Sequence, residues 1–348
     1  MTIELIGWDI GGAHLKAVAI ADDGSTQACQ EPTPLWLGLD PLHRAIAAIK
    51  SALQPAANCR HAVTMTGELV DLFTDRTEGV TALIDAFGRH FAPEPLHVFA
   101  GGRGFLRPDQ IRPEHAPHIA SANWAATALW AATQRRESLL VDIGSTTTDL
   151  IVLAEGRPAP RGTTDCERLR FQELVYTGIT RTSLMALADT APWRGEWTGL
   201  MAEHFATTAD VYRLTGELPD HADLLACADG GDKTVAASAR RLARLLGCDA
   251  GAASLADWQR LARYFRDRQL SAIQQAWHRQ LSTGMLEPQC SVIGAGVGRF
   301  LVQELASRLG HPYQDIADLF PPPRTTGQPS IADCAPAAAV ACLLRLGS

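Results

Sequence analysis

Residues 139–153, LLVDIGSTTTDLIVL, contain two apolar runs with a group of polar residues between them. These polar side chains could bind a phosphate ester. The two apolar runs predict β-strands, and the glycine between them predicts a tight turn. Asp142 precedes the turn and Asp149 follows it, and the turn itself contains Gly144, Ser145, Thr146, Thr147 and Thr148. Glycine allows close backbone approach, N–H and hydroxyl groups can donate to phosphate oxygens, and the two carboxylates could hold a divalent cation through water. The segment therefore predicts a phosphate site with its metal.

The same pattern occurs near the start of the chain, in residues 5–20, LIGWDIGGAHLKAVAI, where Gly12 follows the first glycine. Three pairs of residues align in the two copies: Asp9 with Asp142, Gly11 with Gly144, and Lys16 with Asp149. Either copy alone could be an ordinary glycine-turned β-hairpin, because short glycine motifs also occur by chance. Two copies together favour phosphate binding and predict two related lobes.

Further elements are predicted to bring polar residues toward these turns. A short strand at 61–65 leads to Glu68 at its carboxyl end, where open α/β sheets place their ligands. Glu68 could contact a substrate amine or a metal; alternatively, Thr66 caps the next helix and Glu68 lies in its first turn. Helices are predicted at 42–53, 81–91 and 120–132. The last contains Asn123 and is rich in alanine, so it should pack closely, at the interface between the lobes.

Two more segments could form walls of the same cleft. Within residues 162–182, four polar residues could line it: Asp165, Glu173, Tyr176 and Arg181. Arg181 could anchor a phosphate or a carboxylate, although a surface ion-pair network would explain the same residues. Residues 291–300, SVIGAGVGRF, run from a strand into a helix, with Gly294 and Gly296 at the turn. Apolar spacing predicts helices from 234 to 281.

The composition of the chain excludes several classes of function. The length of 348 residues predicts two lobes, and a net charge of −7 argues against nucleic-acid binding. Arg240, Arg241 and Arg244 are predicted to form a solvated helix face. Eight scattered cysteines indicate buried, reduced thiols rather than a zinc cluster or disulfides. Without an apolar span or signal peptide, we expect a soluble cytoplasmic protein that binds no membrane.

The order of these motifs resembles the superfamily of actin, sugar kinases and Hsp70. The resemblance implies an α/β, two-lobed actin-like ATPase fold of the ribonuclease H-like type. It places the first lobe at 1–135 and the second at 136–348, with a helical insert at about 188–290. Within the superfamily, D-I-G-S-T-T-T-D is closest to the hydantoinase/oxoprolinase group.

More narrowly, several motifs in one order are similar to the family of tetrahydromethanopterin-linked one-carbon-transfer pathway proteins. These motifs are G-W-D-I-G-G-A-H-L-K, M-T-G-E-L, S-A-N-W, D-I-G-S-T-T-T-D, E-L-V-Y-T-G-I-T-R-T, A-T-T-A-D-V-Y-R-L-T-G-E-L and A-P-A-A-A-V-A. The family includes a synthase of methanofuran biosynthesis. The resemblance implies a transferase that joins an aminomethylfuran-methyl diphosphate to the phenol of glutamyl-tyramine, releasing diphosphate and forming a methanofuran or methylofuran precursor.

That reaction assigns roles to the predicted residues. Mg²⁺ between Asp9 and Asp142, together with Lys16 and the N–H and hydroxyl groups of residues 144–148, would stabilise the charge developing on diphosphate. A carboxylate would help by taking the proton of the phenol, whose ordinary pKa is about 10. Asp149 and Glu173 are the candidates for this base. Arg181 or Arg213 would hold the glutamyl carboxylate.

Two other functions remain compatible with the same turns. An ATP-dependent small-molecule kinase or hydantoinase/oxoprolinase-like amidohydrolase would bind the phosphates of ATP there and adenosine at 291–300. A non-catalytic nucleotide sensor would open and close on its ligand.

Overall fold

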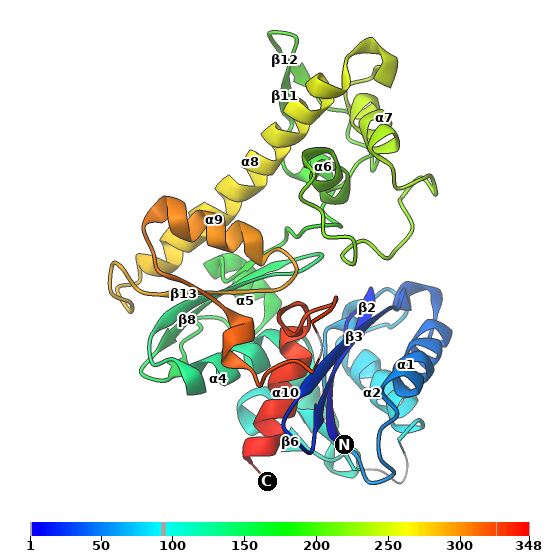
Figure 1. Cartoon of the computed structure of the whole chain (residues 1–348), viewed down its shortest axis with the longest axis vertical. Coiled ribbons are helices and arrows are strands. Elements are labelled where there is room, and N and C mark those ends of the chain that lie inside the picture. The colour runs from blue at the N-terminus through cyan, green and yellow to red at the C-terminus, as the bar shows by residue number, and fades with distance from the viewer. Residues whose placement is uncertain (1, 92–94, 325, 348) are drawn as a thin grey trace.

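The computed structural model describes residues 2–91, 95–324 and 326–347. Two β-sheets, each covered by helices, form two lobes that lie side by side (Figure 1). The two-lobed α/β architecture predicted from the duplicated motif is therefore confirmed.

The first sheet has the strand order β3-β2-β1-β4-β5-β6. Its strands are β1 (Ile3–Ile10), β2 (His14–Ala21), β3 (Thr26–Pro32), β4 (Arg60–Met65), β5 (Leu96–Phe99) and β6 (Phe105–Leu106). The first three form an antiparallel meander, and β4 lies parallel to β1. All but one residue of β1 is buried, since helices cover both faces of the sheet here, and this explains its apolar run.

The second sheet repeats this plan. Its order is β10-β8-β7-β13-β14, with β9 beside β8. The strands are β7 (Ser138–Ile143), β8 (Thr148–Ala154), β9 (Arg157–Pro158), β10 (Leu174–Val175), β13 (Val292–Ala295) and β14 (Tyr313–Asp315). Asp142 is paired with Asp149 across its hairpin, as Asp9 is paired with Lys16 across the first. The two copies that align in the sequence therefore have the same strand register in the structure.

Helices α1 (Asp40–Leu53) and α2 (Arg76–Gly88) pack on the first sheet, together with the short α3 (Ala116–Ile119). Trp8 of β1 meets Phe87 of α2 edge to face, with 5.3 Å between ring centroids. Helix α2 begins earlier than predicted because Asp75 caps it, accepting a hydrogen bond of 2.9 Å from the N–H of Glu78. Thr66 stands at the N-cap position of a short 3-10 helix, Gly67–Leu69, with Glu68 in its first turn, but the Thr66 side chain makes no capping hydrogen bond.

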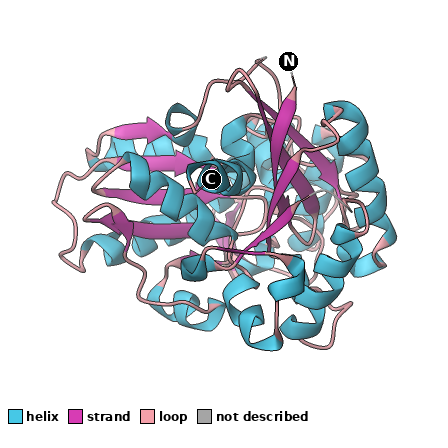
Figure 2. Ribbon diagram, turned by 90° about the horizontal axis from the view of Figure 1, so that it is seen from below, coloured by secondary structure: helices cyan, strands magenta, loops and turns pink. Residues whose placement is uncertain are grey.

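Helices α4 (Asn123–Gln134) and α10 (Ala335–Leu346) lie between the two sheets, where Figure 2 shows the C-terminal helix end-on. Their small side chains let backbones approach closely, as we predicted for the alanine-rich helix. A side chain at Gly7 of β1 would lie only 1.9 Å from the carbonyl oxygen of Ala337. Although α10 falls within 136–348, it packs against β1 and β4 of the first sheet. The exact lobe boundaries stay a prediction.

The second lobe also carries α5 (Asp165–Phe171) and α9 (Arg299–Leu309). The helical insert extends away from both lobes (Figure 1). It consists of the hairpin β11 (Thr190–Trp193) and β12 (Glu196–Gly199) and of the helices α6 (Thr208–Thr215), α7 (Val235–Leu245) and α8 (Leu255–Leu281). Helix α8 begins in the insert and continues into the second lobe, where it packs against β8.

Two predictions about the interior need correction. Arg241 of α7 is buried rather than solvated, and it forms ion pairs with Asp210 at 3.0 Å and Asp229 at 2.8 Å. All eight cysteines are free thiols, as predicted, but Cys166 is exposed. Within the described residues, no helix is both long enough and apolar enough to cross a bilayer.

Candidate active site

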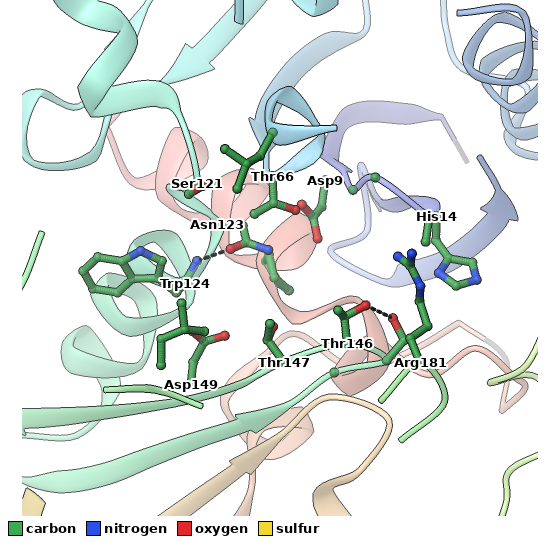
Figure 3. Close-up of a pocket in the computed structure, with 18 of the residues that line it drawn as sticks. Asp9, His14, Thr66, Ser121, Asn123, Trp124, Thr146, Thr147, Asp149 and Arg181 are labelled. Atoms are coloured by element: carbon green, nitrogen blue, oxygen red, sulfur yellow. Dashed lines mark hydrogen bonds between the residues drawn. The ribbon is translucent and has the colours of Figure 1, made fainter. Parts of the chain in front are cut away.

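Two turns face each other across a cavity of about 480 Å³ between the lobes. We call residues 11–13, between β1 and β2, the first phosphate turn, and residues 144–147, between β7 and β8, the second phosphate turn. The predicted residues that line the cavity are Asp9, Gly11, Gly12, Lys16, Asn123, Asp142, Gly144, Ser145, Thr146, Thr147, Asp149, Asp165, Tyr176 and Arg181. The prediction that distant turns meet in one cleft thus agrees with the geometry (Figure 3).

Both turns present backbone donors to the cavity. Each closes on itself, because the N–H of Gly11 donates to the carbonyl of His14 at 3.0 Å and that of Gly144 donates to Thr147 at 2.9 Å. In the part of the chain that the structure describes, five N–H groups at the tips donate to no protein acceptor, those of Gly12, Ala13, Ser145, Thr146 and Thr147. Such groups, converging from two sides, are suited to binding the oxygens of an anion.

Thr148 takes no part in this cradle, contrary to the prediction. Its hydroxyl is buried at the start of β8 and donates to the carbonyl of Thr177 at 2.7 Å. The side chain therefore holds the second phosphate turn from behind rather than facing a ligand.

Asp9 and Asp142 bring two carboxylates to the cavity, of which the first is buried and the second half-buried. Burial raises the pKa of Asp9 to about 6, while Lys16 and the Asn123 amide oppose the shift. Burial also raises the pKa of Asp142 to about 7, and repulsion from Asp149 adds to it. Because Oδ1 of Asp9 is buried without a hydrogen-bond partner, this carboxylate is under-satisfied by the protein alone.

The donor set fits Mg²⁺ bound together with a phosphate. No three His, Cys, Asp or Glu side chains among the described residues form a group that could hold a metal. Mg²⁺ is usually bound by one or two carboxylates plus substrate phosphates and water, rather than by a closed protein cage. The unpartnered oxygen of Asp9 and the nearby carboxylate of Asp142 fit that requirement.

Lys16 is fixed at the edge of the cavity by Asp333, which the sequence analysis did not place there. The Nζ of Lys16 donates to the backbone carbonyl of Asp333 at 2.7 Å. The Asp333 carboxylate accepts from Arg299 at 2.6 Å and lies 3.1 Å from Nε2 of His221. Although burial alone would raise its pKa, the His221 hydrogen bond and Arg299 keep the pKa of Asp333 below its ordinary range. The lysine is thus held by the backbone carbonyl of a residue whose own carboxylate is fixed by Arg299 and His221.

The two candidate bases lie in different surroundings. Asp149 lines the cavity and pairs with Nη2 of Arg168 at 2.7 Å, and Arg168 lies over the ring of Trp124. Burial raises the pKa of Asp149, and Arg168 opposes that shift. Glu173 lies outside the lining, since its carboxylate accepts from the N–H groups of residues 161 and 162 at 2.6 and 3.0 Å. The geometry therefore favours Asp149 and gives Glu173 a role in holding the chain.

Glu68 also lies behind the cavity wall rather than in it. The side chain is buried, and Oε1 accepts from the Ser121 hydroxyl at 2.9 Å. Ser121 also lies 3.2 Å from Asp165, which pairs with Arg76 at 2.5 Å across the two lobes. Burial raises the pKa of Glu68. Direct contact with substrate, as predicted, would need Ser121 to move.

The glycines at 294 and 296 support the site from behind instead of forming its third wall. A side chain at Gly294 would lie 2.6 Å from the ring of Tyr313. One at Gly296, whose φ is +78°, would lie 2.3 Å from Oδ1 of Asp142. Gly296 therefore makes room for the Asp142 carboxylate.

The mouth of the cavity is aromatic and cationic. The Arg181 guanidinium of the second lobe lies 5.1 Å from the ring centroid of Trp36 in the first lobe. Tyr176 is 67% exposed, an unusual state for a large aromatic side chain, and it lines the same cavity. Arg213, the other candidate anchor, lies in the insert and pairs with Asp223 at 2.5 Å, so it does not line the cavity.

Comparison with known proteins places this geometry in a family. The family model for hydantoinase/oxoprolinase matches residues 60–317. The chain belongs to this family. A relative from Methanocaldococcus jannaschii, (4-(4-(2-(γ-L-glutamylamino)ethyl)phenoxymethyl)furan-2-yl)methanamine synthase, is 32% identical over 250 residues, which cover 72% of this chain and 73% of that protein. The Methanococcus vannielii protein of the same name is 41% identical over 76 residues, 22% of this chain and 34% of that protein.

The hydantoinase/oxoprolinase assignment and the M. jannaschii relative agree with the resemblance found in the sequence motifs. Among solved structures, nucleotide-free acetone carboxylase aligns with a TM-score of 0.50 at 10% identity, over 89% of this chain and 68% of that chain. At this identity the likeness concerns the fold alone. With the duplicated sheets, it supports the predicted two-lobed actin-like ATPase fold. The relatives are named as synthases, which places this member of the family among enzymes that act on small molecules.

Proposed function

We propose that this chain is an ether-forming synthase that joins an aminomethylfuran-methyl diphosphate to the phenol of a tyramine derivative and releases diphosphate. The name of the M. jannaschii relative describes a product of this kind, a furan-methanamine linked through a phenoxymethyl group to a glutamylaminoethyl chain. The proposal transfers that chemistry, in methanofuran or methylofuran biosynthesis, to the present chain.

The observation that carries the proposal is the pair of phosphate turns around two under-neutralised aspartates. The turns whose five N–H groups have no protein acceptor line one cavity among the described residues, and Asp9 and Asp142 line it too. This arrangement is complementary to a diphosphate that leaves with increasing negative charge. Mg²⁺ held by Asp9 and Asp142 would neutralise part of that charge.

The reaction breaks one bond and forms another at the furan-methyl carbon. The C–O bond to diphosphate breaks, and its electron pair leaves with the diphosphate oxygen. The phenol oxygen forms the new C–O bond and loses its proton. The Lys16 ammonium and the N–H groups of both turns stabilise the leaving group, while Asp149 accepts the phenolic proton. Arg168, paired with Asp149 at 2.7 Å, orients this carboxylate.

The mouth of the cavity suits the acceptor. A phenol ring can stack on Trp36 or Tyr176, and the guanidinium of Arg181 can bind the carboxylate of a glutamyl group. Arg181 is the better of the two predicted anchors because Arg213 is engaged in ion pairs within the insert.

ATP-dependent phosphoryl transfer is the second candidate, because the same turns could grip the phosphates of ATP. Its proposed adenosine site at residues 291–300 is less suitable than we expected, since Gly294 and Gly296 lie against Tyr313 and Asp142. This observation favours the diphosphate reaction.

The experiment is to incubate the purified protein with the furan diphosphate, glutamyl-tyramine and Mg²⁺ and to measure diphosphate and ether together. We expect equal amounts of both products, and none from the Asp142→Asn variant. Diphosphate with Mg²⁺ should also raise the melting temperature more than ATP with Mg²⁺ does, because the site is proposed to bind diphosphate. A ligand at a hundredfold excess over its Kd adds about 2.7 kcal/mol of stability, which is large enough to measure. ATP hydrolysis without ether formation would refute the proposal in favour of the second candidate.

A further inference from the structure

A segment that follows β10, residues 177–182, braces the second phosphate turn. The N–H of Ile179 donates to the carbonyl of Gly144 at 3.0 Å, and those of Thr180 and Arg181 donate to the carbonyl of Ser145 at 3.1 and 3.0 Å. These bonds orient the two peptide units whose opposite sides carry N–H groups toward the cavity. We call residues 177–182 the brace.

The brace touches the turn too closely for any side chain to intervene. A Cβ at Gly178 would lie 2.5 Å from both the carbonyl carbon of Ser145 and the nitrogen of Thr146. The position of the Gly178 peptide therefore fixes the position of the turn, and a displacement of one must displace the other.

Gln269 of helix α8 holds the brace from the insert side. Its Nε2 donates to the carbonyl of Gly178 and to the hydroxyl of Thr177, both at 2.8 Å. Its Oε1 accepts from the hydroxyl of Tyr212 in α6 at 2.6 Å. Gln269 and Tyr212 are fully buried.

The Gly178 carbonyl fixes which way the Gln269 amide points, because it can only accept, and the Tyr212 hydroxyl then donates to Oε1. If the amide were reversed, Oε1 would face the Gly178 carbonyl, and two buried acceptors would lie together without a donor. We call the Tyr212 hydroxyl, the Gln269 amide and the Gly178 carbonyl the relay. All three groups have hydrogen-bond partners in only one arrangement.

We propose that Gln269 is a positioning residue that couples the helical insert to the second phosphate turn and thereby sets the affinity for the phosphate ester. It touches no ligand and acts through the brace. This role does not depend on which ester is bound, so it goes beyond the proposed reaction. It also gives the insert a function that neither the motifs nor the family assignment supplies.

Helix α8 offers a matched control in Gln280. This side chain is also buried, and its Nε2 donates two hydrogen bonds as that of Gln269 does, here to the backbone carbonyls of Phe171 at 3.0 Å and Gln172 at 2.9 Å. Gln280 contacts neither the brace nor the turn in these hydrogen bonds. Gln269→Leu and Gln280→Leu therefore remove comparable bonds from one helix, and only the first removes the relay.

The test compares hydrogen exchange in the full-length variants, in peptides that cover residues 143–149 and 177–182. We expect both variants to melt at lower temperature, but only Gln269→Leu to exchange faster in these two peptides. Its affinity for inorganic diphosphate with Mg²⁺, measured by calorimetry, should fall about tenfold relative to Gln280→Leu. Equal exchange in the two variants would overturn the proposal.

Tyr212→Phe keeps the test decisive if Gln269→Leu does not fold. Removing the hydroxyl leaves Oε1 of Gln269 buried without a donor and weakens its hold on the brace, so exchange in the same peptides should rise and diphosphate affinity should fall about threefold. Exchange at the wild-type rate in Tyr212→Phe would then overturn the proposal. If wild-type protein binds no diphosphate, exchange alone decides the role of Gln269, and only the proposed function fails.

Discussion

The two phosphate turns share a strand register but differ in the residue that stands opposite the aspartate. Lys16 is paired with Asp9 in the first hairpin, whereas Asp149 is paired with Asp142 in the second. The first hairpin thus brings a cation to the cavity. The second brings another carboxylate, which Arg168 partly neutralises. In the proposed reaction the first hairpin would stabilise negative charge and the second would accept a proton.

The turns also differ in how they are held. Carbonyls of the first turn accept from nearby residues, since the N–H of Thr33 donates to Ala13 at 2.7 Å and that of Leu35 donates to Gly12 at 3.1 Å. The second turn is held by the brace and, through Gln269, by the insert. The first turn is therefore held by residues of its own lobe, whereas the second is also held, through the brace, by helix α8 of the insert.

The largest effect should follow from Lys16→Met, which removes the cation of the first hairpin. Stabilisation of the leaving diphosphate would be lost, and we expect kcat to fall about 10³-fold. Steady-state kinetics with a circular dichroism check of folding measures this. A kcat within threefold of wild type would contradict the charge-stabilising role of the first turn.

Asp149→Asn should lower kcat about 10²-fold, because the phenol would lose its base while diphosphate binding stays intact. A more acidic phenol, such as a fluorinated tyramine derivative, needs the base less and should recover part of the rate. If diphosphate affinity fell as much as kcat, Asp149 would belong to the anion site and the division between the hairpins would be wrong.

Arg181→Gln should raise the KM for glutamyl-tyramine about tenfold and leave the KM for tyramine unchanged, because only the former carries the carboxylate. Comparison of the two acceptors is its internal control. An equal change with both would assign Arg181 to diphosphate instead.

The raised pKa values of Asp9 and Asp142 predict that the stability of the protein depends on pH. The folded pKa values of Asp9 and Asp142, about 6 and about 7, exceed the ordinary value of 3.8. The folded protein therefore holds protons that the unfolded chain releases, and this contribution to stability is lost as the pH rises through 6 to 7. In metal-free protein at pH 7.5, Asp142→Asn should raise the free energy of unfolding by at least about 1 kcal/mol. Thermal melts of wild type and Asp142→Asn from pH 5 to 8, with and without Mg²⁺, measure this. A difference in stability between the two proteins that does not change with pH would contradict the raised pKa of Asp142.

The smallest effect on catalysis should come from Glu173→Gln. Loss of the charged acceptor for two N–H groups should cost about 1 to 3 kcal/mol of stability, while kcat should change less than threefold. A large fall in kcat with unchanged stability would restore Glu173 as a candidate base.

The sequence predicted what depends on short-range pattern. The duplicated apolar runs around Asp9 and Asp142 were sufficient to predict both hairpins and two lobes that share one cleft. The alanines of α4 predicted close packing between the lobes. These features follow from residues within one or two strands of each other.

Features that depend on long-range packing were missed. Glu173 was a candidate base because the sequence does not reveal which groups a carboxylate binds. In the structure this carboxylate accepts from N–H groups of the loop before α5. Gly296 suggested a ligand wall, whereas its missing side chain makes room for Asp142. Trp36 and Asp333 carried no spacing signal. His14, within the D-I-G-G-A-H-L-K motif, also lines the cavity and could have been found, since it lies between two residues already assigned to the site.

The most direct test of the convergence of the two turns is a calorimetric titration of diphosphate at pH 7.5, with and without Mg²⁺, into wild type and into Asp9→Asn and Asp142→Asn. The account predicts one diphosphate per chain, bound only with Mg²⁺ and weakened by either substitution, because both lobes contribute to one site. Binding that ignores Mg²⁺, or that only one of the two substitutions weakens, would contradict it.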